Sequence, residues 1–516
     1  MGNNLAAVLA GRAHERKWHD RPLYYAGDAV LSHGEVHEAG ARAAGRLRAA
    51  GVRRGGRVLV ALPDSAAFVA AFLGTLRLGA VAVLAGPEQT AAEHAYIAAD
   101  ARPQAVVCSA DLAPRFPSVP VLTDDTLTAA PPGGHVPPPE PVAVPADAPA
   151  YVQYTSGTTG KPKGAVHRHG DAHAYFQAMA LGALGLTSED VTFSLSKSCY
   201  PFGLGATVLF PMLSGGAAVL WPDAPSVAGA VRQARRHRPT VLFTVPTWYA
   251  RLVSAPDRAA VRRAFASLRA AASAGEPLLP TLADRIEEIL GCPVLDGLGS
   301  TEVGHTFVSN TVDRRRRGAL GVVLPPYEIE IRTGTGRARP GEPGALHVRG
   351  PSVMAGYLGR PERTREVLGA DGWLRTGDLA HVDADGFVHH HGRALDRITV
   401  SGEPVLPLEV ERVLGQHPGV VEVAVVANGA APRGGNGPSG AGGDAAGALP
   451  EQTLSAFVVI EAGVRPTAAL ERELLALAGA RLARHKVPRT VTFMDELPRT
   501  STGKIRRNAL TCADVP

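Results

Sequence analysis

Short β-branched runs alternate with alanine-rich stretches from about residue 57 to residue 270. Four of these runs, at residues 58–60, 81–84, 105–107 and 240–243, have the length and composition of buried strands. Strands that alternate with helix-length segments form largely parallel sheets, because each helical crossover returns the chain in the same direction. The alternation therefore predicts α/β architecture over the first half of the chain.

The length and a later change of pattern predict two domains. A chain of 516 residues is too long for one ordinary hydrophobic core. After Gly318 hairpin-like strands follow at residues 327–332, 344–349 and 386–391. A compact α+β unit begins near Gly392 and Arg393. We expect a large domain over residues 1–392 and a small one over residues 393–516.

Charge and composition narrow the class of protein. The net charge of +5 is too dilute for a nucleic-acid binder, although small anionic ligands stay open. The four cysteines have neither zinc-site spacing nor the density of a disulfide scaffold, which fits a reducing cytosol. The apolar tract at residues 66–86 contains Arg77 and three glycines, and predicts a core helix followed by a strand rather than a membrane span. We expect a cytoplasmic protein that binds neither membrane nor nucleic acid; a homodimer is compatible with the sequence.

Lysine is rare, since the 53 basic residues comprise 47 arginines and 6 lysines. Lysine should persist where a compact ammonium differs from a planar guanidinium. Three of the six, Lys161, Lys163 and Lys504, fall in two patterns typical of phosphate handling, at residues 155–164 and 497–505. The first follows a strand-like run, so its N–H groups and hydroxyls can surround phosphate oxygens. It lacks the Gly-Lys-Ser/Thr ending of a Walker loop, and alone it fits an ordinary surface loop equally well.

Further blocks follow in order along nearly the whole chain. They are Ser-Ala-Gly-Glu-Pro at 273–277, Asp-Gly-Leu-Gly-Ser-Thr-Glu at 296–302, Gly-Trp-Leu-Arg-Thr-Gly-Asp-Leu at 372–379 and Gly-Arg-Ala-Leu-Asp at 392–396. With the two lysine patterns, they resemble the signature of the adenylate-forming superfamily, which includes aryl-CoA ligases and carrier-protein-loading adenylation domains. Residues 197–205, 245–249 and 299–310 are most similar to benzoate-CoA ligases. The resemblance implies a large domain of parallel-rich α/β subdomains plus a β-barrel-like subdomain, and a small mobile domain.

The resemblance also implies a site for ATP and Mg²⁺. Thr155, Ser156, Gly157, Thr158, Thr159, Gly160 and Lys163 would hold the departing phosphates, with Thr301 on the α-phosphate and Glu302 on Mg²⁺. Gly275, Glu276, Pro277, Asp296, Gly297 and Leu298 would form the adenine slot, and Asp378 with Arg393 would bind the ribose. Lys504 would bridge the substrate carboxylate and the α-phosphate. The alternatives, a turn aspartate at Asp378 and a solvated lysine at Lys504, agree less well with the neighbouring blocks.

In the family the small domain then swings to admit a thiol. The pivot is usually Asp or Lys, whereas this chain has Leu395, so that Asp396 could take over. A second departure is Thr399, where many relatives have lysine. Ser401 and Gly402 match the segment that would line the thiol tunnel.

The predicted acyl pocket is apolar. Between Asp190 and Asp223 the only charge is Lys197, so the aspartate that pairs an amino-acid ammonium is missing. An apolar slot with one or two polar groups suits a small flat aryl acid. We expect it to be lined by Tyr200, Phe202, Gly203, Trp248 and His305. Ordinary core packing is the alternative for each, above all for Trp248.

Two charged runs invite other interpretations. Arginines 314–317 could hold the CoA 3′-phosphate, but such runs usually face water. Residues 389–391 are all histidine, and on a strand only the outer two share a face, so a metal site there lacks a third ligand.

Three functions are therefore compared. The first is an aryl-CoA ligase that converts benzoate or a substituted benzoate, ATP and CoA into aryl-CoA, AMP and pyrophosphate. The second shares the adenylation step but delivers the acyl group to the phosphopantetheine of an acyl carrier protein or to another small nucleophile. The third is a non-catalytic nucleotide-binding relative, against which intact Thr301, Glu302, Asp378 and Lys504 argue.

Overall fold

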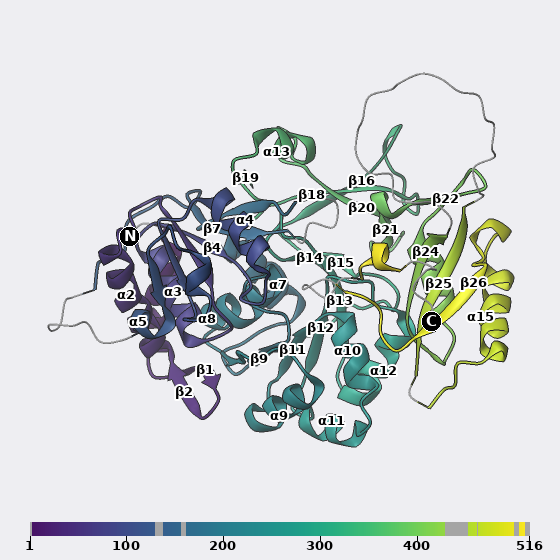
Figure 1. Ribbon diagram of the computed structural model, residues 1–516, viewed down its shortest axis with the longest axis horizontal. Coiled ribbons are helices and arrows are strands. Elements are labelled where there is room, and N and C mark those ends of the chain that lie inside the picture. The colour runs from purple at the N-terminus through teal and green to yellow at the C-terminus, as the bar shows by residue number, and fades with distance from the viewer. Residues whose placement is uncertain are drawn as a thin grey trace.

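Two mixed sheets form the framework of the large domain (Figure 1). The computed structural model describes residues 3–128, 138–155, 161–428, 452–461, 463–499 and 505–510. The first sheet has the order β19-β8-β7-β4-β3-β5-β6 and the second the order β15-β14-β13-β12-β11-β9-β10-β1-β2. Inner neighbours in both sheets run parallel, and antiparallel pairs lie at the edges. The predicted α/β architecture is confirmed.

All four strand-like runs are strands. The first sheet contains β3 (Arg57–Ala61), β4 (Val81–Leu84), β5 (Ala105–Cys108), β6 (Val121–Thr123), β7 (Pro149–Tyr154), β8 (Gly164–Arg168) and β19 (Gly356–Tyr357). The second contains β1 (Pro22–Ala26), β2 (Ala29–Ser32), β9 (Val191–Ser194), β10 (Ala217–Leu220), β11 (Val241–Thr244), β12 (Ala270–Ser273), β13 (Val294–Gly299), β14 (Thr306–Ser309) and β15 (Val322–Val323).

Helices cover these sheets. They include α1 (Leu5–Glu15), α2 (His33–Ala49), α3 (Ala66–Arg77), α4 (Ala91–Ala101), α5 (Asp124–Thr128), α6 (Asp171–Tyr175), α7 (Pro201–Gly203), α8 (Phe210–Ser214), α9 (Val227–His237), α10 (Pro246–Val253), α11 (Arg258–Ala264) and α12 (Pro280–Leu290). Ser32 and Glu35 form a capping box that starts α2, and Thr90 and Glu93 form the one that starts α4. The apolar tract at 66–86 is helix α3 followed by β4, as predicted. Within the described ranges no helix has the length and apolar character needed to cross a membrane.

A five-stranded antiparallel sheet completes the large domain. Its order is β17 (Gly336–Arg337), β16 (Glu328–Thr333), β18 (Gly344–Arg349), β20 (Leu374–Val382) and β21 (Val388–Arg393). It contains the three hairpin-like segments predicted after Gly318. Helix α13 (Pro361–Val367) lies between β19 and β20 in the chain.

The small domain lies at the opposite end of the molecule from the N-terminal helices (Figure 1). It has the hairpin of β22 (Ile398–Val400) and β23 (Glu403–Val405), the sheet of β24 (Val420–Asn428), β25 (Thr453–Ile460) and β26 (Thr490–Met494), and helices α14 (Pro407–Leu414) and α15 (Ala468–Arg481). Leu279 and Ile286 of the large domain share one apolar cluster with Val410 and Leu414 of α14. The two domains are therefore packed against each other through apolar side chains.

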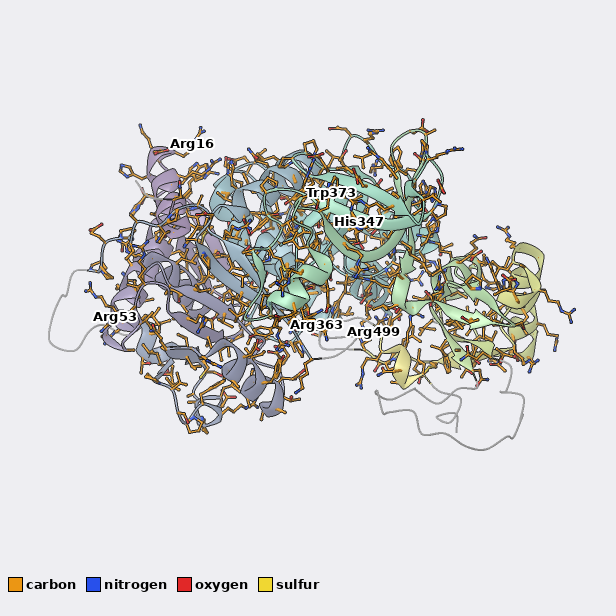
Figure 2. The ribbon with its side chains drawn as sticks, turned by 90° about the horizontal axis from the view of Figure 1, so that it is seen from above. Arg16, Arg53, His347, Arg363, Trp373 and Arg499 are labelled. Atoms are coloured by element: carbon orange, nitrogen blue, oxygen red, sulfur yellow. The ribbon has the colours of Figure 1, made fainter. Side chains whose placement is uncertain are left out.

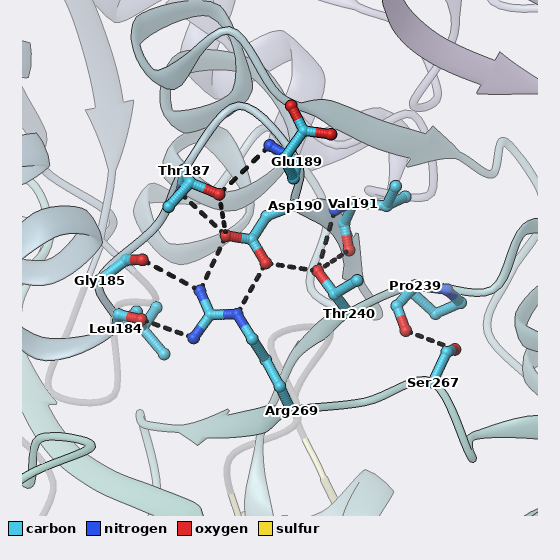
Figure 3. Close-up of polar contacts among 10 residues, drawn as sticks. All are labelled: Leu184, Gly185, Thr187, Glu189, Asp190, Val191, Pro239, Thr240, Ser267 and Arg269. Atoms are coloured by element: carbon cyan, nitrogen blue, oxygen red, sulfur yellow. Dashed lines mark hydrogen bonds and ion pairs between the residues drawn. The ribbon is translucent and has the colours of Figure 1, made fainter.

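A polar network fixes the starts of three strands in the nine-stranded sheet (Figure 3). Both carboxylate oxygens of Asp190, just before β9, accept from Arg269, just before β12, at 2.7 and 2.8 Å. Thr240, just before β11, donates to Asp190 at 2.7 Å, and the backbone N–H of Thr187 donates at 2.8 Å. Burial alone would raise the pKa of Asp190, but these hydrogen bonds outweigh burial and lower it.

Candidate active site

The predicted phosphate loop connects β7 to β8 as a hairpin. The backbone N–H of Thr155 donates to the carbonyl of Lys163 at 2.9 Å, and the N–H of Lys163 donates to Thr155 Oγ1 at 3.3 Å. The Tyr96 hydroxyl on α4 donates to the carbonyl of Pro162 at 2.8 Å. The two ends of the loop are thus held together. Ser156, Gly157, Thr158, Thr159 and Gly160 lie outside the described residues, as does Lys504.

Thr301 and Glu302 lie on the turn between β13 and β14, where three successive carbonyls each accept an outside hydrogen bond. His167 Nε2 is 2.7 Å from the carbonyl of Thr301, the N–H of Met354 donates to that of Glu302 at 2.8 Å, and Ser352 Oγ donates to that of Val303 at 2.6 Å. These bonds come from β8 and from the segment that leads into β19. The turn is therefore held by neighbouring segments as well as by its own bonds from Val303 and Gly304 to the Ser300 carbonyl.

The carboxylate of Glu302 meets the lysine of the phosphate loop through Tyr357. The Tyr357 hydroxyl donates to Glu302 Oε1 at 2.7 Å, and Lys163 Nζ lies 4.7 Å from the centre of the Tyr357 ring. Burial, and next the Glu302 charge, raise the pKa of Tyr357 above its ordinary value, so the hydroxyl keeps its proton and donates. The structure brings Lys163, Thr301 and Glu302 together. Sequence reasoning missed Tyr357, which lies in none of the quoted motifs.

The segments predicted to form the adenine slot follow or end neighbouring strands. Gly275, Glu276 and Pro277 follow β12, while Asp296, Gly297 and Leu298 lie on β13, with Ser273 paired to Asp296. The Glu276 carboxylate accepts from Thr247 Oγ1 at 2.6 Å and pairs with Arg499 of the small domain at 3.3 Å. Burial raises the pKa of Glu276 to about 6 and that of Asp296 to about 8.

Asp378 on β20 is held by an arginine and a histidine from β21. Arg393 Nε lies 3.0 Å and His390 Nε2 3.1 Å from the same oxygen, Asp378 Oδ1. Burial alone would raise the pKa of Asp378, but Arg393 and then His390 outweigh burial and lower it, so the carboxylate is ionised. The predicted pair Asp378 and Arg393 is adjacent, and His390 is an addition that the motif did not contain.

His305 lies inside an aromatic box at the predicted acyl pocket. The ring centres of Phe210, Phe202 and Tyr175 lie 4.8, 5.3 and 5.7 Å from that of His305. His305 is 2% exposed, and neither ring nitrogen meets hydrogen-bond geometry with the residues that the structure describes, although the nearby Phe202 backbone raises the His305 pKa against burial. Burial lowers the pKa of His305 to about 3, so its ring is neutral and offers one donor and one acceptor. Aromatic rings therefore surround a buried, neutral imidazole.

Two π-helical turns, η2 (Phe176–Ala183) and η3 (Leu204–Leu209), shape this box. Tyr175 directly precedes the first, and Phe210 directly follows the second. A Cβ at Gly205, within the second turn, would lie 2.4 Å from the His305 ring. Such turns are frequent at functional sites. Neither they nor Tyr175 and Phe210 could be found from spacing, because the aromatic residues are far apart in the sequence.

The remaining predicted pocket residues lie in different surroundings. A Cβ at Gly203 would lie 2.2 Å from the carbonyl oxygen of Lys197, so only glycine fits there. The Tyr200 hydroxyl donates to Glu88 at 3.4 Å. Trp248 packs on the apolar cluster shared with the small domain, and the Arg251 guanidinium lies over its ring at 4.7 Å. Phe202 and His305 are thus brought together, whereas Trp248 makes no ring contact with either in the described part of the chain.

The predicted hinge and tunnel residues lie at the start of the small domain. Leu395 and Asp396 form a 3₁₀ turn with Ala394, and Leu395 is 79% exposed. Ser401 and Gly402 connect β22 to β23 with positive φ angles of 50° and 83°, as a two-residue hairpin turn requires.

The two charged runs have internal partners. Arg316 pairs with Asp383 and Asp385, and Arg317 pairs with Asp284 and Glu287. This pairing favours the structural interpretation of the arginine run. His389 stacks on His381, and His391 lies 2.7 Å from the same ring, so the outer two histidines do share a face. No cluster of metal ligands occurs within the described ranges.

Comparison with known proteins places this geometry in a family. The model of the AMP-binding enzymes matches residues 11–358, and that of the AMP-binding enzyme C-terminal domain matches residues 445–504. The chain belongs to the AMP-binding enzymes. This adenylate-forming ligase is 41% identical over 515 residues to the p-hydroxybenzoic acid–AMP ligase FadD22 of Mycobacterium tuberculosis, a match over 98% of this chain and 68% of that protein.

Two further relatives agree with this assignment. The benzoate–CoA ligase of Thauera aromatica is 32% identical, over 99% of this ligase and 95% of that protein. The crystal structure of the anthranilate CoA ligase AuaEII with anthranoyl-AMP has a TM-score of 0.87 and 28% identity, over 98% of this chain and 96% of that one. The resemblance to the aryl-acid branch of the adenylate-forming superfamily is thus confirmed.

Proposed function

We propose that this ligase activates a hydroxylated benzoic acid with ATP and passes the acyl group to the phosphopantetheine thiol of a carrier protein. The observation that carries the substrate class is the aromatic box around His305. Phe202, Phe210 and Tyr175 pack on the His305 ring, and a polar group in aromatic surroundings of this kind suits a hydroxylated aryl ring. The FadD22 relatives, at 40–41% identity, are named for p-hydroxybenzoic acid.

The proposed chemistry begins at the α-phosphate of ATP. A thiol cannot displace oxide from a free carboxylate, so the carboxylate oxygen attacks the α-phosphorus and pyrophosphate leaves. The resulting acyl adenylate has AMP as its leaving group. The thiol sulfur then attacks the acyl carbon, the bond from that carbon to the AMP oxygen breaks, and the thiol proton is released. Negative charge gathers on phosphate oxygens in the first step, so cations are needed there.

Several side chains would divide this work. Thr155 to Lys163 would hold the departing phosphates, Thr301 would contact the α-phosphate, and Lys504 would neutralise the reacting oxygens. Asp378, fixed by Arg393 and His390, would accept both ribose hydroxyls. The segments containing Gly275 and Asp296 would enclose the adenine.

The residues also fit Mg²⁺. Glu302 offers a hard carboxylate oxygen, and because its Oε1 is held by Tyr357, Oε2 is left for a cation. When bound, the ion would neutralise developing phosphate charge. Glu302 would hold it beside Lys163.

A second acceptor, CoA, has its own support. Relatives of 30–34% identity are named as CoA ligases for benzoate, hydroxybenzoates or anthranilate. The more similar relatives are named for the acid and AMP alone, which favours the carrier protein.

Two assays test the proposal. ATP–pyrophosphate exchange is measured with 4-hydroxybenzoate, 3-hydroxybenzoate, benzoate, anthranilate and short aliphatic acids. We expect exchange that depends on a hydroxybenzoate. A preference for aliphatic acids would refute the substrate class. Thioester formation is then measured with free CoA and with phosphopantetheinylated carrier proteins. A faster reaction with free CoA than with any carrier protein would refute the carrier-protein acceptor and favour CoA.

A further inference from the structure

We infer that Tyr357 is a positioning residue that sets the Glu302 carboxylate and the Lys163 ammonium in register for the metal–nucleotide complex. The inference rests on the proposed function, because it takes Glu302 as the Mg²⁺ ligand. Tyr357 contacts the side chains of Glu302 and Lys163, which are far apart in the sequence. It would act through these neighbours rather than on the substrate.

The backbone of Tyr357 is fixed on several sides. Strand β19 pairs with β8, with Tyr357 opposite Ala165, two residues after Lys163. The N–H of Leu358 donates to the carbonyl of Gly164 at 2.8 Å, and the N–H of Tyr357 donates to Thr364 Oγ1 at 2.9 Å. The residue is 6% exposed. Its ring therefore has a defined position beside the start of β8, where Lys163 emerges.

The two contacts of this ring differ in kind. The hydroxyl donates to Oε1 of Glu302 at 2.7 Å, which selects one carboxylate orientation and leaves Oε2 free of this donor. Partners that orient a metal ligand in this way typically change metal affinity about 10- to 100-fold when they are removed. The face of the ring holds the ammonium of Lys163 at 4.7 Å, a cation–π distance. The contribution of the Tyr357 hydroxyl can therefore be separated from that of its ring by substitution with Phe and with Leu.

The surroundings of Glu302 reinforce this role. Its main chain is held by Met354, three residues before Tyr357, so backbone and side chain of Glu302 are anchored by one segment. The phosphate loop is anchored by the same segment through Leu358 and Gly164. Residues 354–358 therefore join the proposed metal ligand to the proposed phosphate grip.

The test measures binding instead of turnover. Mn²⁺ affinity in the presence of a non-hydrolysable ATP analogue is followed by electron paramagnetic resonance, and ATP affinity without metal is followed by calorimetry in chelator. Tyr357→Phe should weaken Mn²⁺ binding about tenfold and leave metal-free ATP binding unchanged. Tyr357→Leu should weaken Mn²⁺ binding equally and also weaken metal-free ATP binding about threefold, because it removes the ring under Lys163.

Two controls separate this role from general loosening. Tyr249→Phe removes a buried hydroxyl that donates to the carbonyl of Ala272 at 2.9 Å, away from Glu302, and should leave both affinities unchanged. Glu302→Gln should weaken Mn²⁺ binding at least as much as Tyr357→Phe. Unchanged Mn²⁺ affinity in Tyr357→Phe, with Glu302→Gln weakened, would overturn the positioning role alone. Unchanged affinity in Glu302→Gln would overturn the metal assignment in the proposed function and the inference with it.

Discussion

At the scale of single residues, His305 is a buried polar side chain in the proposed acyl pocket. A buried polar group without a partner costs about 1–3 kcal/mol, so most such groups are paired. His305 is unpaired on both nitrogens among the residues that the structure describes, and aromatic rings surround it. Under the proposed function, a substrate hydroxyl bonded to His305 would remove this cost.

Replacing His305 by Phe should reduce the preference of the ligase for 4-hydroxybenzoate over benzoate. We expect kcat/KM for 4-hydroxybenzoate to fall about tenfold or more while that for benzoate changes by less than about threefold, because only the first loses a hydrogen bond. Pyrophosphate exchange with both acids measures the ratio. Phe202→Leu is the matched control, since it alters the same wall without a polar group and should affect both acids alike. An unchanged ratio in His305→Phe would exclude its role in reading the hydroxyl.

Asp378→Asn should weaken ATP binding through the ribose. The variant keeps the shape but loses the charge to which Arg393 and His390 are bound. Hydrogen bonds to a charged group are worth about 1.5–3 kcal/mol, so the Kd for ATP should rise about 10- to 100-fold. Calorimetry with ATP and 2′,3′-dideoxyATP checks the cause: the native ligase should prefer ATP, and the variant should not. A variant that still discriminates would show that the ribose is bound elsewhere.

At the scale of elements, the predicted site segments follow the carboxyl ends of strands. The phosphate loop follows β7, Glu276 follows β12, and the turn with Thr301 follows β13. Ligand sites in α/β sheets occupy these ends. The opposite ends of β9, β11 and β12 are joined by the network of Asp190, Thr240 and Arg269. In the nine-stranded sheet, the network and the segments that contain Glu276 and Thr301 thus lie at opposite ends of the strands.

Asp190→Asn tests this division. The Asp190 side chain is 7% exposed and that of Arg269 is 37% exposed, so removing the charge leaves a half-buried guanidinium without its counter-ion. We expect a loss of about 2–3 kcal/mol in the free energy of unfolding, less than for a fully buried pair because Arg269 reaches water. Urea denaturation measures this loss. The KM for ATP at low temperature should stay within about twofold of native, and a large rise would mean that the network reaches the site.

Strand periodicity predicted the elements well, because a buried run of β-branched residues has few alternatives to a strand. Residues 58–60, 81–84 and 105–107 all lie in β3, β4 and β5. Ordered motifs predicted the nearness of Lys163, Thr301 and Glu302. Four side chains were not predicted because their contacts join segments that are distant in the sequence: Tyr175, Phe210, His390 and Tyr357. The π-helical turns were not predicted either, because nothing in the local sequence distinguished them from α-helix.

At the scale of the whole molecule, the two domains meet at a partly buried ionic cluster. Arg499 pairs with Glu276 of the large domain at 3.3 Å and with Glu422 on β24 at 2.6 Å, and lies where the two domains join (Figure 2). We propose the domain boundary at residues 392 and 393, with Leu395 and Asp396 as the pivot. In the sequence, Arg499 precedes Lys504 by five residues.

The contribution of the Glu276 carboxyl group to the stability of the ligase should fall between pH 4.5 and 7. Burial raises the pKa of Glu276 from 4.5 to about 6, so the folded state keeps a proton that the unfolded chain loses. The stabilisation is complete below pH 4.5 and is lost as the pH rises through about 6, a change of about 2 kcal/mol for this carboxyl group. In the Glu276→Gln variant the amide does not ionise in this pH range, so this contribution does not change with pH. Urea midpoints at pH 5 and 7.5 should therefore show the variant gaining on the native ligase at the higher pH. The same difference at both pH values would mean that Glu276 titrates normally and that Arg499 compensates its burial in full.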